Sequence, residues 1–282
     1  MTGTAAPSAS LGARFRLTLI TADPALAAAA DRAGVDRIGL DLEKLGKEAR
    51  QAGAATRLSD HDWKDFAAIA PALARADLFA RLDPLHPGTP GEIERALQAG
   101  VRVLMLPFFH GADEVDRFVR LVGRRAQVVI LLETAAASLR VRDVLAVPGI
   151  DEVMLGLNDL RLQFGVRSHF EVLASPLLDA LAAEAHRAGI PLSLGGLARP
   201  DDTTLPVAPD LVYAQFPRLG ATGAWIARSF FRESGLRGSA SATDIGPAIA
   251  AIRRRLDRWA AATPAVLEQA RADLADEARR IA

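Results

Sequence analysis

Eight short apolar segments alternate with Ala-rich amphipathic segments between Arg14 and Phe231. Uninterrupted apolar runs of this kind are typical of strands that are buried on both faces of a parallel sheet. Eight strand–helix units in series favour a closed (β/α)8 barrel, the TIM barrel, over an open doubly wound sheet, and one such barrel uses about 250 residues. We therefore predict an α/β fold, one barrel with appendages, for the 282-residue chain. The expected strands are Phe15–Ile20, Arg37–Leu42, Leu78–Leu82, Val101–Leu106, Val128–Leu132, Glu152–Leu155, Pro191–Leu194 and Ala224–Ser229.

The segments between the strands carry helix start and stop signals. Pro24 and Pro90 suit a first helical turn, and Asp60 suits a cap. A glycine follows four of the helices, where a left-handed cap favours this residue; these glycines are Gly34, Gly100, Gly123 and Gly189. The expected helices are Pro24–Ala33, Asp60–Ala74, Pro90–Ala99, Ala112–Val122, Thr134–Leu145, Pro176–Ala188 and Pro209–Arg218.

The pattern changes after the last strand. We expect the barrel to occupy residues 1–232, a Gly/Ser/Ala-rich linker residues 233–246, and a C-terminal helical extension residues 247–282. The extension contains two expected helices, Pro247–Ala261 and Pro264–Ile281. A helical pair of this kind either mediates self-association or folds back on its own barrel, and we favour an oligomerisation arm, hence a homo-oligomer.

Composition excludes several classes of function. The 34 basic and 34 acidic residues cancel, so no overall field attracts nucleic acid or an anionic membrane. The absence of cysteine excludes disulfides, thiolate metal sites and cysteine nucleophiles. No apolar run reaches the roughly 18 residues of a membrane helix, and Met1–Ser10 does not resemble a signal peptide, so we expect a cytoplasmic protein. Only Lys44, Lys47 and Lys64 supply amines, none inside a strand, which disfavours Schiff-base chemistry.

In a TIM barrel the active site lies at the C-terminal ends of the strands. Glu133 directly follows one expected strand, and Asp159 closely follows the next. Two carboxylates from neighbouring strand ends can share a hard divalent cation, or each can cap the helix that follows it. Arg81, at the end of the third strand, can hold a carboxylate or enolate oxygen, or form a salt bridge to Asp41 or Glu43.

A long basic loop follows the second strand. It runs from Asp41 to Arg57 and contains Lys44, Lys47 and Arg50. Loops of this length are often functional lids, although a solvated surface loop is an equal alternative. Gly195 and Gly196 follow the seventh strand, where they either let a ligand approach the backbone or form a tight turn.

Several segments, in order, resemble the HpcH/HpaI aldolase and citrate lyase beta-subunit family, whose members are (β/α)8 barrels. These are Gly34-Val35-Asp36-Arg37-Ile38-Gly39-Leu40-Asp41-Leu42-Glu43, Ala80-Arg81-Leu82, Ala99-Gly100-Val101-Arg102-Val103-Leu104-Met105-Leu106-Pro107, Leu131-Leu132-Glu133-Thr134, Val147-Pro148-Gly149-Ile150-Asp151 and Gly156-Leu157-Asn158-Asp159-Leu160. Other segments, such as Arg218-Leu219-Gly220, look like a less-characterised branch associated with polysaccharide and specialised-metabolite pathways.

The resemblance implies a divalent metal, Mg²⁺ or Mn²⁺, held by Glu133 and Asp159, with Arg81 on the substrate. It also implies a 2-oxo acid substrate that is cleaved to pyruvate and an aldehyde, or a related acyl-CoA ester. Both reactions require stabilisation of an enolate. We expect Asn158, Gly195, Gly196 and Arg228 to complete the substrate site.

The sequence departs from the family after the second strand. Pyruvate aldolases of the family show Asp-x-Glu-His there, whereas this chain has Asp41-Leu42-Glu43-Lys44. The general base can then be a metal-bound water, Lys44, His61 or His86. The leading hypothesis is a metal-dependent aldolase; the alternatives are an acyl-CoA lyase, whose phosphates the basic loop can meet, and a barrel that binds a ligand without catalysis.

Overall fold

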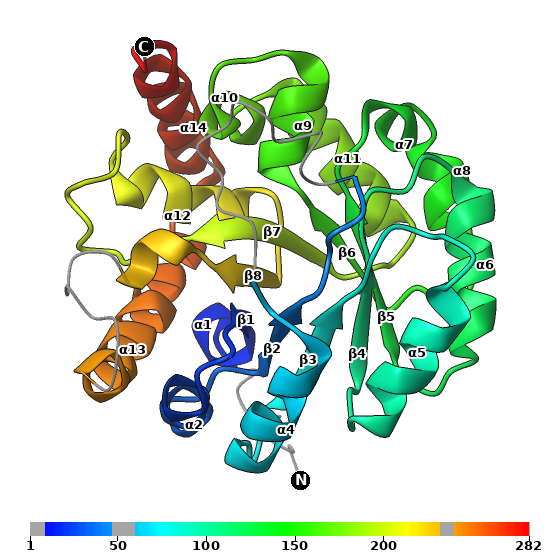
Figure 1. Cartoon of the computed structure of the whole chain (residues 1–282). Coiled ribbons are helices and arrows are strands. Elements are labelled where there is room, and N and C mark those ends of the chain that lie inside the picture. The colour runs from blue at the N-terminus through cyan, green and yellow to red at the C-terminus, as the bar shows by residue number, and fades with distance from the viewer. Residues whose placement is uncertain (1–8, 47–59, 232–239, 282) are drawn as a thin grey trace, which may run out of the picture.

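The computed structural model describes residues 9–46, 60–231 and 240–281. Eight parallel strands form a closed barrel in sequential order, and the last strand pairs with the first, with Arg16 opposite Gly223 (Figure 1). The expected (β/α)8 barrel is confirmed, and every expected strand is present within a few residues. The strands are β1 (Arg16–Ile20), β2 (Arg37–Asp41), β3 (Asp77–Arg81), β4 (Val103–Leu106), β5 (Gln127–Leu132), β6 (Glu152–Leu155), β7 (Leu192–Leu197) and β8 (Gly223–Ile226).

Helices surround the barrel, and five lie close to their expected positions: α2 (Pro24–Arg32), α5 (Thr89–Gln98), α6 (Ala112–Val122), α11 (Pro176–Arg187) and α12 (Pro209–Arg218). All four expected cap glycines have positive φ; Gly123, at φ 61°, ends α6 in the left-handed conformation. The structure adds three short helices that the sequence analysis did not predict, α1 (Leu11–Arg14), α9 (Leu157–Phe164) and α10 (His169–Leu173), and a 3₁₀ turn, η3 (Arg228–Phe231).

Two expected helices are interrupted. The segment expected as Asp60–Ala74 is divided into η1 (Trp63–Asp65), α4 (Phe66–Ile69) and η2 (Ala70–Ala72). Pro71 explains why α4 ends at Ile69, because proline has no backbone N–H to donate to a continuing α-helix. The segment expected as Thr134–Leu145 is divided into α7 (Ala135–Leu139) and α8 (Val141–Leu145), because Arg140 between them has a non-helical φ of −112°.

The barrel interior is packed with side chains. An apolar layer across it is formed by Phe79, Val103, Met105, Val129, Leu131 and Met154, with Ile20 and Trp225 packed against it. A separate, larger apolar layer lies between the sheet and the surrounding helices. The barrel axis is therefore filled, and chemistry is confined to its two ends.

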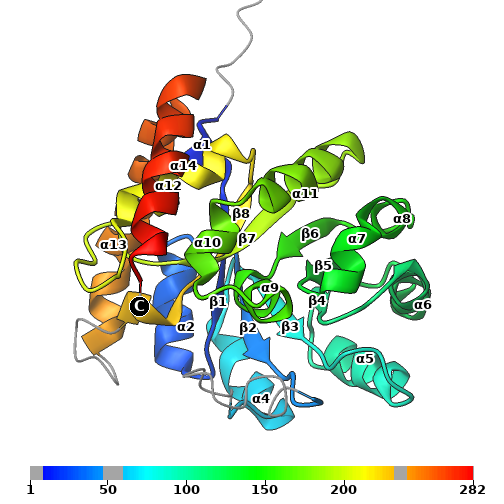
Figure 2. The ribbon, with the colours of Figure 1, turned by 90° about the horizontal axis from the view of Figure 1, so that it is seen from above.

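The C-terminal helices, α13 (Ala240–Ala260) and α14 (Pro264–Arg279), lie against the barrel of their own chain (Figures 1 and 2). Helix α13 contacts α1, α2 and α12, and α14 contacts α10 and α12. Ile249, Ile252 and Leu256, which form an apolar stripe on the extension that we expected to mediate self-association, are buried within the chain. The apolar stripe is thus already covered, as in the fold-back alternative, and self-association through this extension stays a prediction.

The extension is also polar where it meets the N-terminal segment. Arg253 donates to the carbonyls of Gly12 at 2.6 Å and Phe15 at 3.0 Å, and the Asp257 carboxylate accepts from the Gly12 N–H at 2.6 Å. Helix α13 begins at Ala240, earlier than the expected start at Pro247, so part of the expected linker is helical. Among the described residues, no helix combines the length and apolarity that a bilayer crossing requires.

Candidate active site

Arg81 is at the centre of a buried ion-pair cluster at the C-terminal end of the barrel. Asp41 ends β2 and Arg81 ends β3, directly opposite each other in the parallel register. The Arg81 Nε and Nη2 atoms donate to the two carboxylate oxygens of Asp41 at 2.8 and 2.7 Å, and Nη1 lies 3.2 Å from Glu43 Oε2. The predicted salt bridges of Arg81 are both present.

The surroundings of Arg81 fix its charge and its plane. Burial alone would lower the pKa of the guanidinium, but the charges of Asp41 and Glu43 outweigh it and raise the pKa above its ordinary value. The charge of Glu133 acts in the same direction. The guanidinium carbon lies 4.8 Å from the ring centre of Trp225, a cation–π contact that the sequence analysis missed.

Glu133 occupies space that a glycine leaves open. Gly156 follows β6 and donates its N–H to the carbonyl of Leu132 at 3.0 Å, so Glu133 and Gly156 lie side by side. A Cβ atom on Gly156 would lie 2.5 Å from Glu133 Oε2, which requires glycine here. Glu133 Oε1 accepts the Phe108 N–H at 3.2 Å, and the side chain is buried.

The helix-cap alternative for Glu133 is wrong. The next residue, Thr134, caps α7, and its hydroxyl oxygen accepts the Ala137 N–H at 3.1 Å. Asp159 lies in the first turn of α9, whose cap residue Gly156 has no side chain, and is 9% exposed. Glu133 directly follows β5 and Asp159 is in the helix that follows the adjacent strand β6; carboxylate oxygens of this kind suit a hard divalent cation such as Mg²⁺ or Mn²⁺.

A second group of potential metal ligands follows β3. The ligand atoms of Asp83, His86 and Glu92 lie within 4.8 Å of one another. Asp83 Oδ1 accepts the backbone N–H groups of Lys44 and Leu45 at 2.6 and 2.7 Å, so it also holds the start of the basic loop. Burial raises the pKa of Glu92, and the charge of Asp83 adds to this effect. The sequence analysis missed Glu92; its position in the first turn of α5 was the available signal.

The candidate bases Lys44, His61 and His86 lie at different positions around the barrel mouth. His61 reaches the strand end, where its Nδ1 atom accepts the Asp41 N–H at 3.2 Å. Because Nδ1 accepts this hydrogen bond, the ring proton is on Nε2. The side chain of Lys44 is exposed, and His86 lies 3.2 Å from Glu92. Lys47, Arg50 and Arg57, on which the lid and the acyl-CoA alternative depended, lie outside the described residues.

The remaining predicted substrate residues are on the same end of the barrel. Asn158 is half-buried in the first turn of α9. Gly195 and Gly196 are in the last part of β7, where the pairing with β8 shifts register between Leu194 and Leu197. Arg228 begins η3, but its side chain is outside the described part of the chain.

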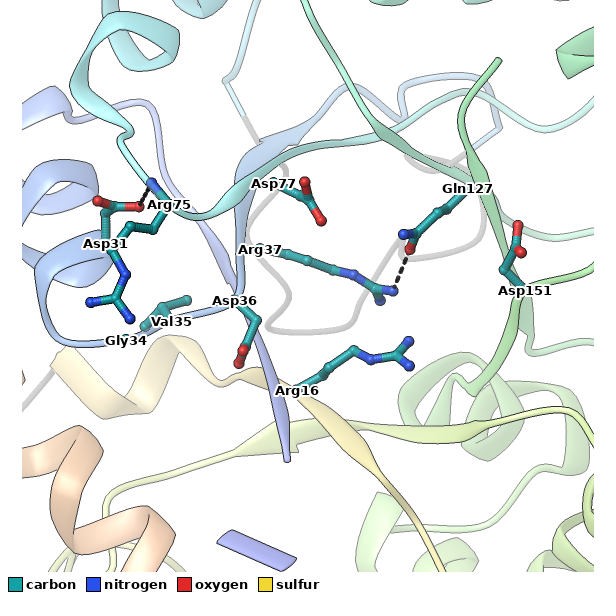
Figure 3. A pocket seen from close by; sticks show the side chains of 10 residues that line it. All are labelled: Arg16, Asp31, Gly34, Val35, Asp36, Arg37, Arg75, Asp77, Gln127 and Asp151. Atoms are coloured by element: carbon teal, nitrogen blue, oxygen red, sulfur yellow. Dashed lines mark hydrogen bonds between the residues drawn. The ribbon is translucent and has the colours of Figure 1, made fainter. Parts of the chain in front are cut away.

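The N-terminal end of the barrel contains a cavity of about 530 Å³ (Figure 3). Figure 3 shows Arg37 directed at Gln127, to which its Nη2 atom donates at 3.1 Å. The Arg37 Nη1 atom donates to Glu152 at 2.8 Å. This cavity is at the opposite end from Arg81 and Glu133, where TIM barrels carry stability rather than catalysis, so it is not the active site.

Comparison with known proteins identifies a family and a fold. Residues 14–192, more than half of the chain, match the family model described as HpcH/HpaI aldolase/citrate lyase. A search of curated proteins finds no match.

Solved structures match most of the chain at low identity. An HpcH/HpaI aldolase from Desulfitobacterium hafniense DCB-2 has a TM-score of 0.58 at 16% identity, covering 77% of this chain and 87% of its own. An HpcH/HpaI aldolase/citrate lyase family protein from Burkholderia cenocepacia J2315 has a TM-score of 0.59 at 18% identity, and the match covers 76% of this chain and 88% of its own. The citrate synthase SbnG has a TM-score of 0.60 at 14% identity, and the match covers 84% of this chain and 96% of its own. At these identities the structures show a shared fold.

Proposed function

The chain belongs to the HpcH/HpaI aldolase/citrate lyase family, which supports a lyase- or aldolase-type activity, and we propose that it is a divalent-metal-dependent aldolase. It would cleave or form a 2-oxo acid through a pyruvate enolate, with an aldehyde as the second substrate. The observation that carries this proposal is the position of two residues: Arg81 ends β3 and Glu133 directly follows β5, so both lie at the same end of the barrel.

Glu133 and Asp159 are the proposed metal ligands. Their support is the space beside Gly156 and the burial of both carboxylates. A divalent cation bound there would hold the carbonyl and carboxylate oxygens of the 2-oxo acid and stabilise negative charge on the enolate oxygen.

Arg81 is proposed to orient the 2-oxo acid and stabilise the enolate oxygen. A guanidinium has five N–H donors; in the described contacts two of them donate to Asp41, and Nη1 forms an ion pair with Glu43. Asp41 and Glu43 act through Arg81: they hold its plane and keep it charged. The donors are then in place before the charge develops, and no reorganisation is needed in the transition state.

His61 is proposed to contribute a hydrogen bond rather than to act as the base. The Asp41 N–H occupies Nδ1, so the neutral ring presents Nε2–H as a donor, suited to the oxygen of the aldehyde. In cleavage, the C4 hydroxyl of the 2-oxo acid loses its proton and becomes the carbonyl of the aldehyde. The bond between C3 and C4 breaks, its electron pair forms the C2–C3 double bond, and the C2 oxygen carries the enolate charge. Protonation at C3 then gives pyruvate. With Lys44 exposed and His61 engaged at Nδ1, we assign the proton acceptor to water at the barrel mouth.

Exchange of the pyruvate methyl protons with deuterium tests this function without knowledge of the aldehyde. The metal-free protein, reloaded with Mg²⁺ or Mn²⁺, should catalyse exchange that saturates with pyruvate, and a chelator should abolish it. Absence of exchange with both metals would overturn the proposal. Exchange of acetyl-CoA methyl protons instead would replace it with the acyl-CoA alternative.

A further inference from the structure

A second cavity, of about 290 Å³, opens beside the C-terminal ends of β7 and β8. Gly196 and Ala227 line it from the strand ends, and His169 and Phe170 line it from α10. Leu205 and other residues of the segment between β7 and α12 complete its wall. The cavity is thus on the catalytic end of the barrel, but outside the cluster around Arg81.

The described lining of the cavity carries no charge at neutral pH. Its described lining includes no aspartate, glutamate, lysine or arginine. Desolvation and the charge of Arg161 lower the pKa of His169, although its side chain is exposed at the surface, so the imidazole is uncharged at neutral pH. The hydroxyl of Tyr213 donates to the carbonyl of Ala198 at 2.7 Å, and burial raises the pKa of this phenol. An uncharged and largely apolar group therefore suits the cavity.

Gly196, which lines the cavity, follows Gly195 in the last part of β7. A Cβ atom on Gly195 would have only Leu155 O within 4 Å, at 3.8 Å, and one on Gly196 would have no neighbour within 4 Å. Gly196 also has a φ of 82°, which L-amino acids with side chains rarely adopt. Among the described residues, no side chain beyond their chain neighbours lies within 4 Å of either Cβ position, so the surface at the end of β7 is open beside the cavity.

We propose that this cavity binds the apolar alkyl or aryl group of the second substrate and so selects aldehydes by chain length. The inference rests on the proposed function, in which the charged mouth holds the 2-oxo acid. The polar reacting atoms would then lie at the mouth, and the hydrocarbon part of the aldehyde would extend past Gly196. A volume of about 290 Å³ is small for a ligand pocket, so it suits a short hydrocarbon chain.

The dependence of kcat/KM on the length of the aldehyde tests the assignment of this cavity. With pyruvate and aldehydes from acetaldehyde to hexanal, kcat/KM should rise about fourfold per added methylene until the cavity is full. Ala227→Leu fills the cavity from the strand end and should lower the hexanal-to-acetaldehyde ratio of kcat/KM at least tenfold. Ala265→Leu, the same change at an exposed position of α14, should leave the ratio unchanged. Equal rates for all aldehydes in the unchanged protein would overturn the inference.

A binding measurement separates this inference from the proposed function. Hexan-1-ol, which cannot react, should shift the imidazole NMR signals of His169 saturably in the unchanged protein and in Ala265→Leu, but not in Ala227→Leu. If Ala227→Leu does not fold, Val212→Phe fills the cavity from α12 instead. Pyruvate exchange without any His169 shift would overturn the cavity assignment alone. A His169 shift without pyruvate exchange would overturn the proposed function and retain the apolar site.

Discussion

The barrel has an arginine–carboxylate cluster at each end, and the ion pairs of the two clusters differ in composition. At the N-terminal end, Arg16 and Arg37 share one glutamate, Glu152, at 2.9 and 2.8 Å, and Ser193 also donates to that carboxylate. At the C-terminal end, one arginine, Arg81, faces several carboxylates.

This difference separates a structural cluster from a reactive one. At the N-terminal end, the arginines pair with Glu152 and Gln127 beside the cavity of that end. The C-terminal cluster has more carboxylates than arginines in the described contacts, an excess of negative charge that a divalent cation would neutralise. The same side-chain types therefore serve stability at one end and, on our proposal, cation binding at the other.

Replacement of a carboxylate at the C-terminal end of the barrel is expected to have the largest effect on metal binding and activity. Glu133→Gln should abolish divalent-metal binding and slow pyruvate exchange more than about 100-fold, with little change in thermal stability. Equilibrium dialysis with metal analysis measures the stoichiometry. The matched control is Asp83→Asn, in the second carboxylate group, which should keep the metal. Loss of metal in Asp83→Asn with retention in Glu133→Gln would move the metal site to the loop after β3.

Removal of the acid from the N-terminal end should act on stability instead. Glu152→Gln leaves the 3%-exposed Arg37 without its carboxylate and should lower the free energy of unfolding by about 3–5 kcal/mol. Urea denaturation measures this change. Glu94→Gln, which breaks the exposed pair with Arg125, should cost less than about 1 kcal/mol. Loss of pyruvate exchange in the folded fraction of Glu152→Gln would contradict the division between the two ends.

A change to the central arginine tests whether it does more than bridge acids. Arg81→Lys keeps the charge but loses the paired donors, so pyruvate exchange should slow roughly 100-fold while metal affinity stays nearly constant. The control is Arg95→Lys. Arg95 is exposed on α5 and also stacks on a tryptophan, with its guanidinium carbon 4.9 Å from the ring centre of Trp63. Exchange near the original rate in Arg81→Lys would leave Arg81 with a structural role only.

The smallest expected effect concerns the aromatic face above Arg81. Trp225→Phe weakens the cation–π contact and should slow pyruvate exchange about threefold, with unchanged metal stoichiometry. Trp63→Phe makes the same change in the Arg95 pair and should have no effect on exchange. An equal loss in both variants would point to a general stability effect rather than to the site.

The strands and most helices were predictable because their signals are local. Apolar runs between glycines and prolines define them, and Asp41 and Arg81 could be paired from their positions at strand ends. Helix α9 was missed because Asn158 and Asp159 were interpreted as strand-end loop residues, and the helix begins directly after β6.

Contacts between distant residues were not predictable. Arg37 and Glu152 are 115 positions apart, and neither has a local signal that names its partner. Trp225 was assigned to a strand by its apolar character, which does not show that its ring lies over Arg81. The uncharged cavity likewise depends on α10, β7, β8 and α12 together, so no single segment indicates it.

The contacts of α13 with the first residues of the chain determine when the fold can be completed. Arg253 and Asp257 bind Gly12, 241 and 245 positions earlier, next to the point where β1 meets β8. During synthesis, β1 to β7 can form while this junction is still without its last strand and its covering helix. We expect the nascent barrel to expose the open edge of β1 until β8 and α13 have left the ribosome. Contacts this far apart in sequence form slowly, so this edge is the point at which misassembly or chaperone binding would occur.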